Sequence, residues 1–220
     1  GGKTLALASQ MWGSHDIATS IPSTEITQQS QSDEQARHGD DVGRIIAHDV
    51  VEERLRQIKG SLSRAGIDPA RIKTSVNLTE SSHNICADVV LVDAPCSSLG
   101  VLRRRPSQRW RLASEHYVTH ELPALQLDIL QQASRLVKQG GRLVYATCSI
   151  CQAENEGVVD AFQSSDDFTM HQWTPWNFDH CRESDTINDG IVDTEYSHCQ
   201  TLLPHRHESD GFFIARWKRL

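Results

Sequence analysis

Apolar and polar positions alternate along the chain in two ways, and together they predict an α/β protein. Short apolar runs predict strands at 43–48, 71–76, 88–92, 142–146 and 211–217. Apolar residues three or four positions apart predict helices at 51–65, 122–137 and 153–162. Strands that alternate with helices form a mostly parallel sheet with helices on both faces.

Two stretches interrupt this pattern. Residues 13–41 are rich in serine, threonine, glutamine and aspartate and contain almost no large apolar residue. Such a segment buries too little surface to offset the entropy of ordering it, so we predict a flexible polar insertion. Residues 173–199 have no clear period, which predicts irregular structure. We expect a single domain over residues 1–220, with the insertion inside it.

Acids and thiols that can bind a ligand or take part in catalysis gather where the predicted strands end. Four of them follow a strand within a few positions: Asp49, Asp93, Cys96 and Cys148. Parallel sheets bind ligands outside the carboxyl ends of their strands. The pattern therefore predicts a binding or catalytic site at this edge of the sheet.

Composition narrows the class of protein. The 220 residues are 38% hydrophobic and 23% charged, which is typical of a soluble globular domain. No apolar run reaches the roughly 18 residues of a membrane span, and we see no secretory signal. Six cysteines in a chain of this length do not predict a disulfide framework, so we expect free thiols in a reducing compartment inside the cell.

Charge adds one local feature. The net charge of −7 argues against a general nucleic-acid coat protein but allows a local basic patch. Five arginines and one tryptophan lie within residues 103–111, directly after the segment that contains Cys96. Such a run can be a solvated loop, and its place beside a thiol favours a role in binding.

Asp49 has two interpretations. An acid at the end of a strand can accept hydrogen bonds from both ribose hydroxyls, roughly 20 residues after a glycine turn. Removing the polar insertion brings Asp49 to about that distance from Gly1 and Gly2. Alternatively, Asp49 stabilises the start of the helix that follows it.

Two further chemistries are open at this level. Gly1-Gly2-Lys3-Thr4 could end a phosphate-binding P-loop, as in a nucleotide hydrolase, but that leaves both thiols without a role. Cys148 and Cys151 form a C-x-x-C, which occurs in zinc sites and redox pairs. A second C-x-x-C is missing from the sequence, and we expect no metal.

One reaction has a use for two thiols and an acid: methyl transfer to carbon 5 of cytosine. This carbon is a poor nucleophile until a thiolate adds to carbon 6, which is covalent catalysis. An acid beside nitrogen 3 makes the ring more electrophilic, and a base must later remove the proton from carbon 5. A second thiol could assist in that last step.

Five stretches resemble, in order, the RsmB-like (Sun/Fmu) family of RNA cytosine-5 methyltransferases. They are GGKTLALA, GRIIAHDVVEERL, VLVDAPCSSLGVLRRRP, GGRLVYATCSICQAENEGVV and LPHRHESDGFFIARW. They span nearly the whole chain, and the pair of DAPC and TCS motifs is the most specific part. The resemblance implies a Rossmann-like methyltransferase fold, S-adenosylmethionine as cofactor and rRNA or tRNA as partner.

The resemblance also implies roles for individual residues. Cys148 matches the nucleophile, Cys96 the cysteine that helps to release the product, and Asp93 a carboxylate shared by the cofactor and base pockets. The remaining cofactor-binding positions are Gly1, Gly2, Lys3, Asp49 and Asn77. The positions that match RNA contacts are Arg103, Arg104, Arg105 and Trp110, which would neutralise phosphates and stack on bases.

Two departures from the family pattern shape the expectations. The Cys-Ala-x-Pro-type stretch before Gly-Gly-Lys is missing, so we expect an N-terminally truncated catalytic domain without its first strand. Asn77 stands where the family has an acid near the adenine. A non-catalytic RNA-binding relative is therefore the alternative. We expect a monomer away from membranes, in the cytoplasm first and otherwise in the nucleolus or an organelle.

Overall fold

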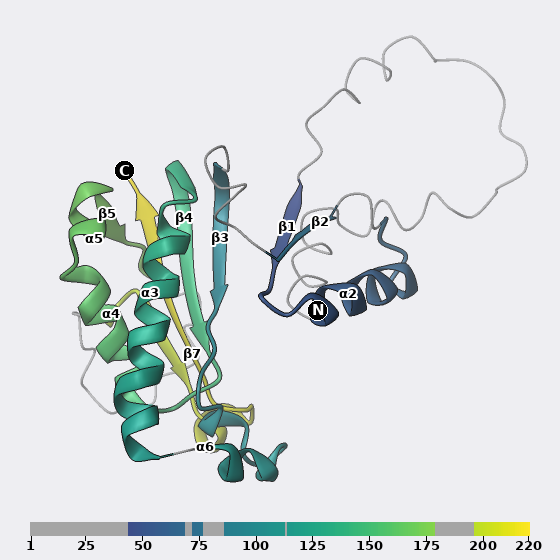
Figure 1. Ribbon diagram of the computed structural model, residues 1–220. Helices are drawn as coiled ribbons and strands as arrows, with labels where there is room; N and C mark the ends of the chain where they lie inside the picture. The colour runs from purple at the N-terminus through teal and green to yellow at the C-terminus, as the bar shows by residue number, and fades with distance from the viewer. Residues whose placement is uncertain (1–43, 69–71, 77–85, 113, 179–195) are drawn as a thin grey trace, which may run out of the picture. The chain divides into compact units, whose positions relative to one another are not determined.

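The computed structural model describes residues 44–68, 72–76, 86–112, 114–178 and 196–220 (Figure 1). The chain divides into two compact units, Gly1–His83 and Asn84–Leu220, and each is described by itself. The predicted insertion at 13–41 lies outside the described residues, as do Gly1, Gly2, Lys3 and Asn77. A single domain over the whole chain and a missing first strand stay predictions.

The first unit contains two parallel strands and one helix. Strand β1 (Ile45–His48) pairs with β2 (Ile72–Ser75), and helix α2 (Glu52–Arg64) lies between them in sequence. The apolar side chains of these elements form one small core, because β1 alternates buried and exposed positions and α2 buries one face. This core consists of Ile45, Ala47, Leu55, Ile58, Leu62 and Ile72. All three elements were predicted from the sequence, and the structure confirms them.

The second unit is built on a five-stranded mixed sheet. Its strands are β3 (Ala87–Asp93), β4 (Val137–Thr147), β5 (Trp173–Pro175), β6 (Cys199–Leu202) and β7 (Phe212–Arg219). The order is β3-β4-β7-β5, and β6 also pairs with β7. Strands β3 and β4 are parallel, whereas β7 runs antiparallel to β4, β5 and β6. The antiparallel part arises because β7 starts beside the carboxyl end of β4 and returns along it.

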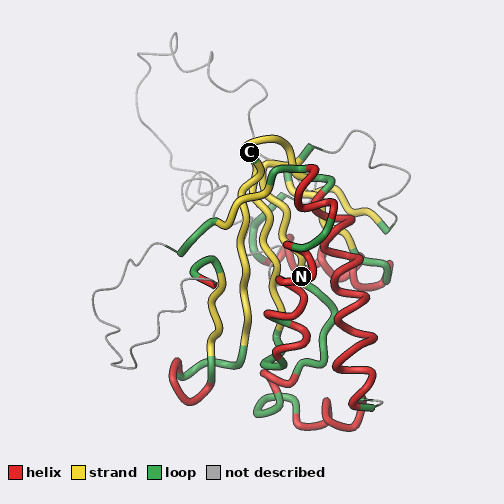
Figure 2. The backbone as a smooth tube through the Cα atoms, turned by 90° about the vertical axis from the view of Figure 1, so that its left-hand side faces the viewer, coloured by secondary structure: helices red, strands yellow, loops and turns green. Residues whose placement is uncertain are grey.

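Helices of the second unit cover one face of this sheet. Figures 1 and 2 show α3 (Leu122–Ser134) and α4 (Glu156–Gln163) on the same side of the strands. Two short helices, α5 (Asp166–Met170) and α6 (Pro204–His207), complete the set of α-helices among the described residues. Shorter helical turns occur at Leu99–Val101, Pro106–Arg111, Tyr117–Glu121 and Gln152–Glu154.

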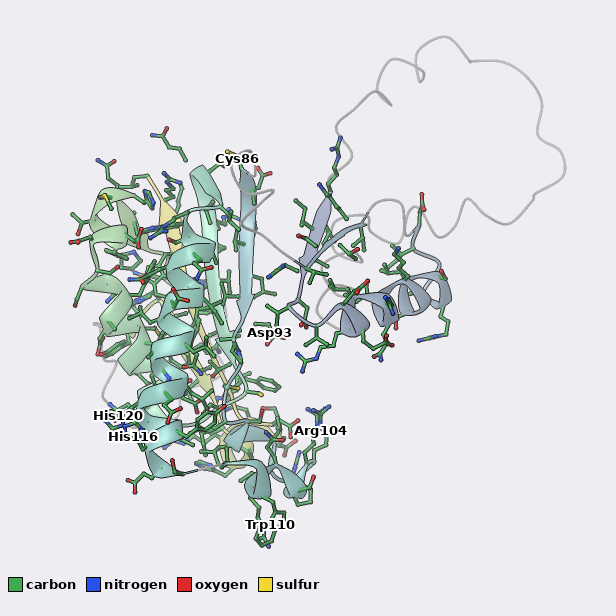
Figure 3. The ribbon with its side chains drawn as sticks, viewed as in Figure 1. Cys86, Asp93, Arg104, Trp110, His116 and His120 are labelled. Atoms are coloured by element: carbon green, nitrogen blue, oxygen red, sulfur yellow. The ribbon has the colours of Figure 1, made fainter. Side chains whose placement is uncertain are left out.

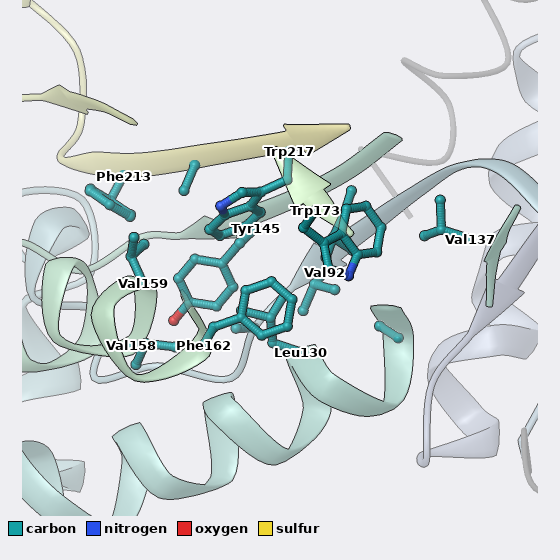
Figure 4. Close-up of a cluster of buried hydrophobic side chains, with 14 residues drawn as sticks. Val92, Leu130, Val137, Tyr145, Val158, Val159, Phe162, Trp173, Phe213 and Trp217 are labelled. Carbon is teal, nitrogen blue, oxygen red and sulfur yellow. The ribbon is translucent and has the colours of Figure 1, made fainter. Parts of the chain in front are cut away.

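The core of the second unit lies between the sheet and helices α3 and α4. Leu130, Tyr145, Phe162 and Trp217 are completely or almost completely buried there (Figure 4). The rings of Phe162 and Trp217 meet edge to face with 5.1 Å between their centroids. This packing makes the sheet a rigid platform for the loops that follow β3 and β4.

The structure corrects two details of the sequence interpretation. Helix α3 ends at Ser134, and Gly140 and Gly141 lie inside β4 instead of ending the helix. The pairing of β3 with β4 shifts register at this point, and Gly140 has a φ of +77°, which glycine adopts without strain. The stretch at 173–199 also contains β5, and it ends where β6 begins.

Candidate active site

The candidate site lies where β3 and β4 end side by side. Asp93 is in register with Ala146, and the Ala94 N–H donates to the Ala146 carbonyl oxygen at 3.0 Å. Figure 3 shows Asp93 at the end of β3. Three residues past Asp93 comes Cys96, and two residues past Ala146 comes Cys148. The structure thus brings together the ends of the two strands that carry the predicted catalytic residues.

The two thiols are in direct contact. The Sγ atoms of Cys96 and Cys148 are 3.4 Å apart, and Cys148 also donates to the Ser98 hydroxyl at 3.4 Å. Neither cysteine forms a disulfide, and both are half-buried. The hydrogen bond with Cys148, then burial, then the charge of Cys148 raise the pKa of the Cys96 thiol. Cys96 therefore keeps its proton at neutral pH while Cys148 stands beside it.

Backbone contacts hold the loop after β4 in place. The Gly100 N–H donates to the Cys148 carbonyl oxygen at 3.0 Å, and the Gly211 N–H donates to the Gly100 carbonyl oxygen at 2.8 Å. A Cβ atom on Gly100 would lie 2.3 Å from the Gly211 carbonyl oxygen. Only a residue without a side chain allows this approach, which joins both thiol-bearing loops to the start of β7.

A buried carboxylate that the sequence analysis missed is hydrogen-bonded to the residues that directly follow the two cysteines. Glu154 is fully buried. Its Oε1 accepts hydrogen bonds from the Ser97 N–H at 2.7 Å and from Gln126 Nε2 at 3.0 Å. Its Oε2 accepts from the hydroxyls of Ser97 and Ser149, each at 2.5 Å. Both predicted cysteines are followed by a serine, and these serines turn out to bind Glu154. The sequence alone does not show which acid they bind.

Most of the basic run lies on the surface. Arg103, Arg104 and Arg105 are exposed, and the indole of Trp110 is 77% exposed (Figure 3). The guanidinium of Arg109 lies 4.4 Å from the centre of the Trp110 ring. Arg104 is partly engaged, since its Nη2 lies 3.0 Å from Asp210 Oδ2. The three arginines and the tryptophan are thus placed as side chains that can meet a partner.

In the first unit, Asp49 stands at the carboxyl end of β1. Its Oδ1 accepts from the Val51 N–H at 2.8 Å, which supports the start of α2, and its Oδ2 lies 3.5 Å from Arg54 Nη1. The side chain is 28% exposed. A carboxylate at a strand end with an accessible oxygen fits ribose hydroxyls, so the two interpretations of Asp49 are compatible.

Among the described residues, no group of three or more histidine, cysteine, aspartate or glutamate side chains is arranged to hold a metal ion. Likewise, none of the helices in the described ranges is long and apolar enough to cross a membrane.

Comparison with known proteins identifies the class. The protein resembles the structure titled NSun6 from Pyrococcus horikoshii with SFG, an analogue of S-adenosylmethionine, at 28% identity with a TM-score of 0.61. That match covers 80% of this chain and 41% of the other. The fold is the Rossmann-like fold of S-adenosylmethionine-dependent methyltransferases.

The family follows from the sequence. The family described as 16S rRNA methyltransferase RsmB/F matches residues 36–218, and the chain belongs to it. A probable ribosomal RNA small subunit methyltransferase B from Synechocystis is 34% identical over 81% of this chain and 38% of its own length. The protein of the same description from Bacillus subtilis is 31% identical over 80% of this chain and 38% of its own length. The chain spans about two fifths of these curated relatives, and its membership decides against a P-loop hydrolase.

Proposed function

We propose that the protein is an RNA cytosine-5 methyltransferase, which transfers a methyl group from S-adenosylmethionine to carbon 5 of a cytosine in rRNA or tRNA. The observation that carries this proposal is the contact of the Cys96 and Cys148 thiols, 3.4 Å apart at the ends of two parallel strands. The family supports it, because its description names rRNA methyltransferases.

The chemistry assigns one bond change to each thiol. Cys148 Sγ adds to carbon 6 of the ring, and the electrons of the C5–C6 double bond become available at carbon 5. S-adenosylmethionine, when bound, supplies the methyl group to carbon 5. Cys96 then takes the proton from carbon 5, the C5–C6 double bond forms again and the bond from Cys148 to carbon 6 breaks. Asp93 hydrogen-bonds nitrogen 3 and favours the first step.

A single hydrogen bond orders these two roles. Before Cys148 bonds to carbon 6, its contact with Cys96 is the first cause of the raised pKa of Cys96, so Cys96 stays protonated and can donate to a thiolate at Cys148. Once Cys148 is bonded to carbon 6, it carries no charge and is a weaker acceptor. The pKa of Cys96 then falls, although burial still raises it, and the fraction of Cys96 that has lost its proton supplies the base that the release step needs.

The proposal also assigns binding groups for the cofactor and the RNA. In this proposal Asp49 holds the ribose of S-adenosylmethionine, Gly1, Gly2 and Lys3 form the end of the cofactor-binding loop, and Asn77 hydrogen-bonds the adenine. Arg103, Arg104 and Arg105 neutralise RNA phosphates and Trp110 stacks on a base, since all four are exposed. The target cytosine must leave its stack to reach Cys148. We further propose that the protein acts as a monomer in a reducing intracellular compartment, where both thiols stay free.

The test is a covalent trap. We expect the Cys96→Ala variant, mixed with S-adenosylmethionine and cellular RNA, to form a protein–RNA adduct that survives denaturation, because release is blocked. The adduct should vanish in Cys96→Ala/Cys148→Ala and persist in Cys96→Ala/Cys151→Ser, the matched control for a neighbouring thiol. Sequencing the trapped RNA identifies the substrate.

A different result would favour the non-catalytic alternative. That outcome is the absence of an adduct in a Cys96→Ala protein that binds both RNA and S-adenosylmethionine, each measured separately by calorimetry. An adduct that persists without Cys148 would contradict the assignment of the nucleophile.

A further inference from the structure

Glu154 has a full set of hydrogen bonds from neutral donors, although it is completely buried. Two donors are nitrogens, the Ser97 N–H and Gln126 Nε2, and both reach Oε1. The other two are hydroxyls, from Ser97 and Ser149, and both reach Oε2. An ionised carboxylate has about four acceptor sites and no donor, so this arrangement matches its capacity.

These bonds join the two loops that carry the thiols. Ser97 directly follows Cys96, and Ser149 directly follows Cys148. The two hydroxyls meet at the same carboxylate oxygen and lie 3.0 Å from each other. Any relative movement of the loops must therefore break at least one bond to Glu154.

Glu154 and the residue after it are also hydrogen-bonded to strand β4. The Tyr145 hydroxyl donates to the Glu154 carbonyl oxygen at 2.7 Å, and Tyr145 belongs to the buried core of β4. In the next residue, Asn155 Oδ1 accepts from the Thr147 hydroxyl at 2.7 Å, and Asn155 Nδ2 donates to the Ser149 carbonyl oxygen at 3.2 Å. The carboxylate is thus anchored to the rigid sheet and not only to the loops.

We propose that Glu154 is the positioning residue that sets the spacing of the two thiols. Its carboxylate holds the serine that follows each cysteine, so that the Sγ atoms stay in contact. The role in catalysis rests on the proposed function, because neighbouring ring carbons 5 and 6 have to meet Cys96 and Cys148 in one geometry. The role in spacing does not depend on it.

Glu154→Gln is the sharpest change. The side chain keeps its size, but one acceptor oxygen becomes an NH₂ group. At the Oε1 position this group faces two N–H donors, and at the Oε2 position it faces two hydroxyls that must turn from donors into acceptors. Whichever way the amide turns, one pair of donors loses its acceptor oxygen. The two loops are then free to separate while the rest of the core is unchanged.

The first measurement reads the spacing without any catalysis. A trivalent arsenical such as 4-aminophenylarsine oxide forms two As–S bonds with two neighbouring thiols and releases one water. We expect the native protein and Cys151→Ser to bind one equivalent tightly, and Cys96→Ser to lose this binding. Glu154→Gln should bind about tenfold to 100-fold more weakly, because closure of the second As–S bond depends on how well the thiols are placed.

Glu156→Gln is the matched control. Glu156 lies two residues further along, in the first turn of α4, and is half-buried. The same chemical change there should leave arsenical binding within about twofold of the native protein, because Glu156 has no part in the proposed spacing of the two thiols. Thermal unfolding and circular dichroism of both variants report whether they are folded.

A second measurement reads catalysis. Single-turnover formation and release of the RNA adduct should both slow by about 100-fold in Glu154→Gln, because both thiols are displaced. Affinity for S-adenosylmethionine and the KM for RNA should stay near the native values. A loss of stability alone would instead lower the active fraction and leave the rate constants of the folded fraction unchanged.

Unchanged arsenical affinity in a folded Glu154→Gln protein would overturn the proposal. If that variant does not fold, Ser149→Ala decides, since it removes one hydroxyl from Oε2 and should weaken arsenical binding by several fold. Native-like arsenical binding by Ser149→Ala would then count against the positioning role of Glu154. Weakened arsenical binding in Glu154→Gln, together with an absent RNA adduct in Cys96→Ala, would keep the positioning role and refute the proposed function instead.

Discussion

Gly100→Ala should destabilise the second unit although it adds only one methyl group. The new Cβ would lie 2.3 Å from the Gly211 carbonyl oxygen and 2.8 Å from the Gly211 Cα, and both are backbone atoms that no rotamer change can move. An ordinary contact needs more than 3.4 Å, so the two segments must separate by about 1 Å. Gly100 and Gly211 are both buried, so this movement must displace packed neighbours.

The magnitude follows from the hydrogen bonds that this movement stretches. Two backbone bonds pass through the pair: from the Gly211 N–H to the Gly100 oxygen at 2.8 Å, and from the Gly100 N–H to the Cys148 oxygen at 3.0 Å. Leaving a buried donor without its acceptor costs about 1–3 kcal/mol. With partial relaxation, we expect the free energy of unfolding to fall by about 2–4 kcal/mol.

Urea denaturation followed by tryptophan fluorescence measures this change, because Trp173 and Trp217 are buried in the second unit. Gly60→Ala is the control, since Gly60 lies on the exposed face of α2 with only an arginine tip within 4 Å of the new Cβ. There the same substitution should not destabilise the protein, because alanine favours a helix more than glycine does. A Gly100→Ala protein whose unfolding free energy stays within about 0.5 kcal/mol of the native value would refute the reasoning.

Three further substitutions or reagents test other parts of the structure. Burial lowers the pKa of His198, and neither ring nitrogen has a hydrogen-bond partner among the described residues. The folded protein therefore loses stability as the pH falls below about 6.5, where the unfolded chain takes up the proton; His198→Leu should reduce that loss between pH 7.5 and 5, and an identical pH dependence would contradict this. Burial first, and nearby carboxylates second, raise the pKa of Cys199 to about 12, so iodoacetamide at pH 8 should modify it far more slowly than the exposed Cys86; mass spectrometry that finds equal rates would disprove the placement. Asp167 is buried and accepts from Arg135 Nε and Nη2, each at 3.0 Å, so Asp167→Asn should cost about 1–2 kcal/mol in urea denaturation after allowance for the exposed arginine, whereas a neutral effect would show that the pair contributes nothing.

Local periodicity was enough to predict the elements with a strong pattern. Strand β3 spans Ala87–Asp93 where the apolar run predicts 88–92, and α2 spans Glu52–Arg64 where the spacing predicts 51–65. Helix α2 buries one face, so its hydrophobic pattern reports its position directly, and β3 is found from its continuous apolar run although only Val92 in it is fully buried. Their agreement with the structure needs no knowledge of distant contacts.

Elements that depend on distant partners could not be predicted in this way. Strands β5 and β6 are three and four residues long and exist because they pair with β7. The glycines at 140 and 141 were misread for a related reason, since a helix end and a bulge both use glycine. The difference between the two is made by the pairing of β4 with β3, which the local sequence does not contain.

The site shows the same division. Cys96 and Cys148 were predicted together because the carboxyl ends of parallel strands meet, and that rule needs only the order of elements. Glu154 has no such rule, since an acid just before a helix is common and is usually solvated. Its burial follows from Ser97, Ser149 and Gln126, which come from three separate parts of the chain.

The spacing of strands alone does not explain the contact of the thiols. Paired strands lie about 4.8 Å apart, and the last registered pair is Asp93 with Ala146. From there the chain runs three residues to Cys96 and two residues to Cys148, outside the regular ladder. Each free residue adds rotatable bonds, so two unrestrained loops would sample many Sγ–Sγ distances. A separation of 3.4 Å therefore requires restraints beyond the sheet, and the hydrogen bonds of Glu154 and of Gly100 supply them directly after each cysteine.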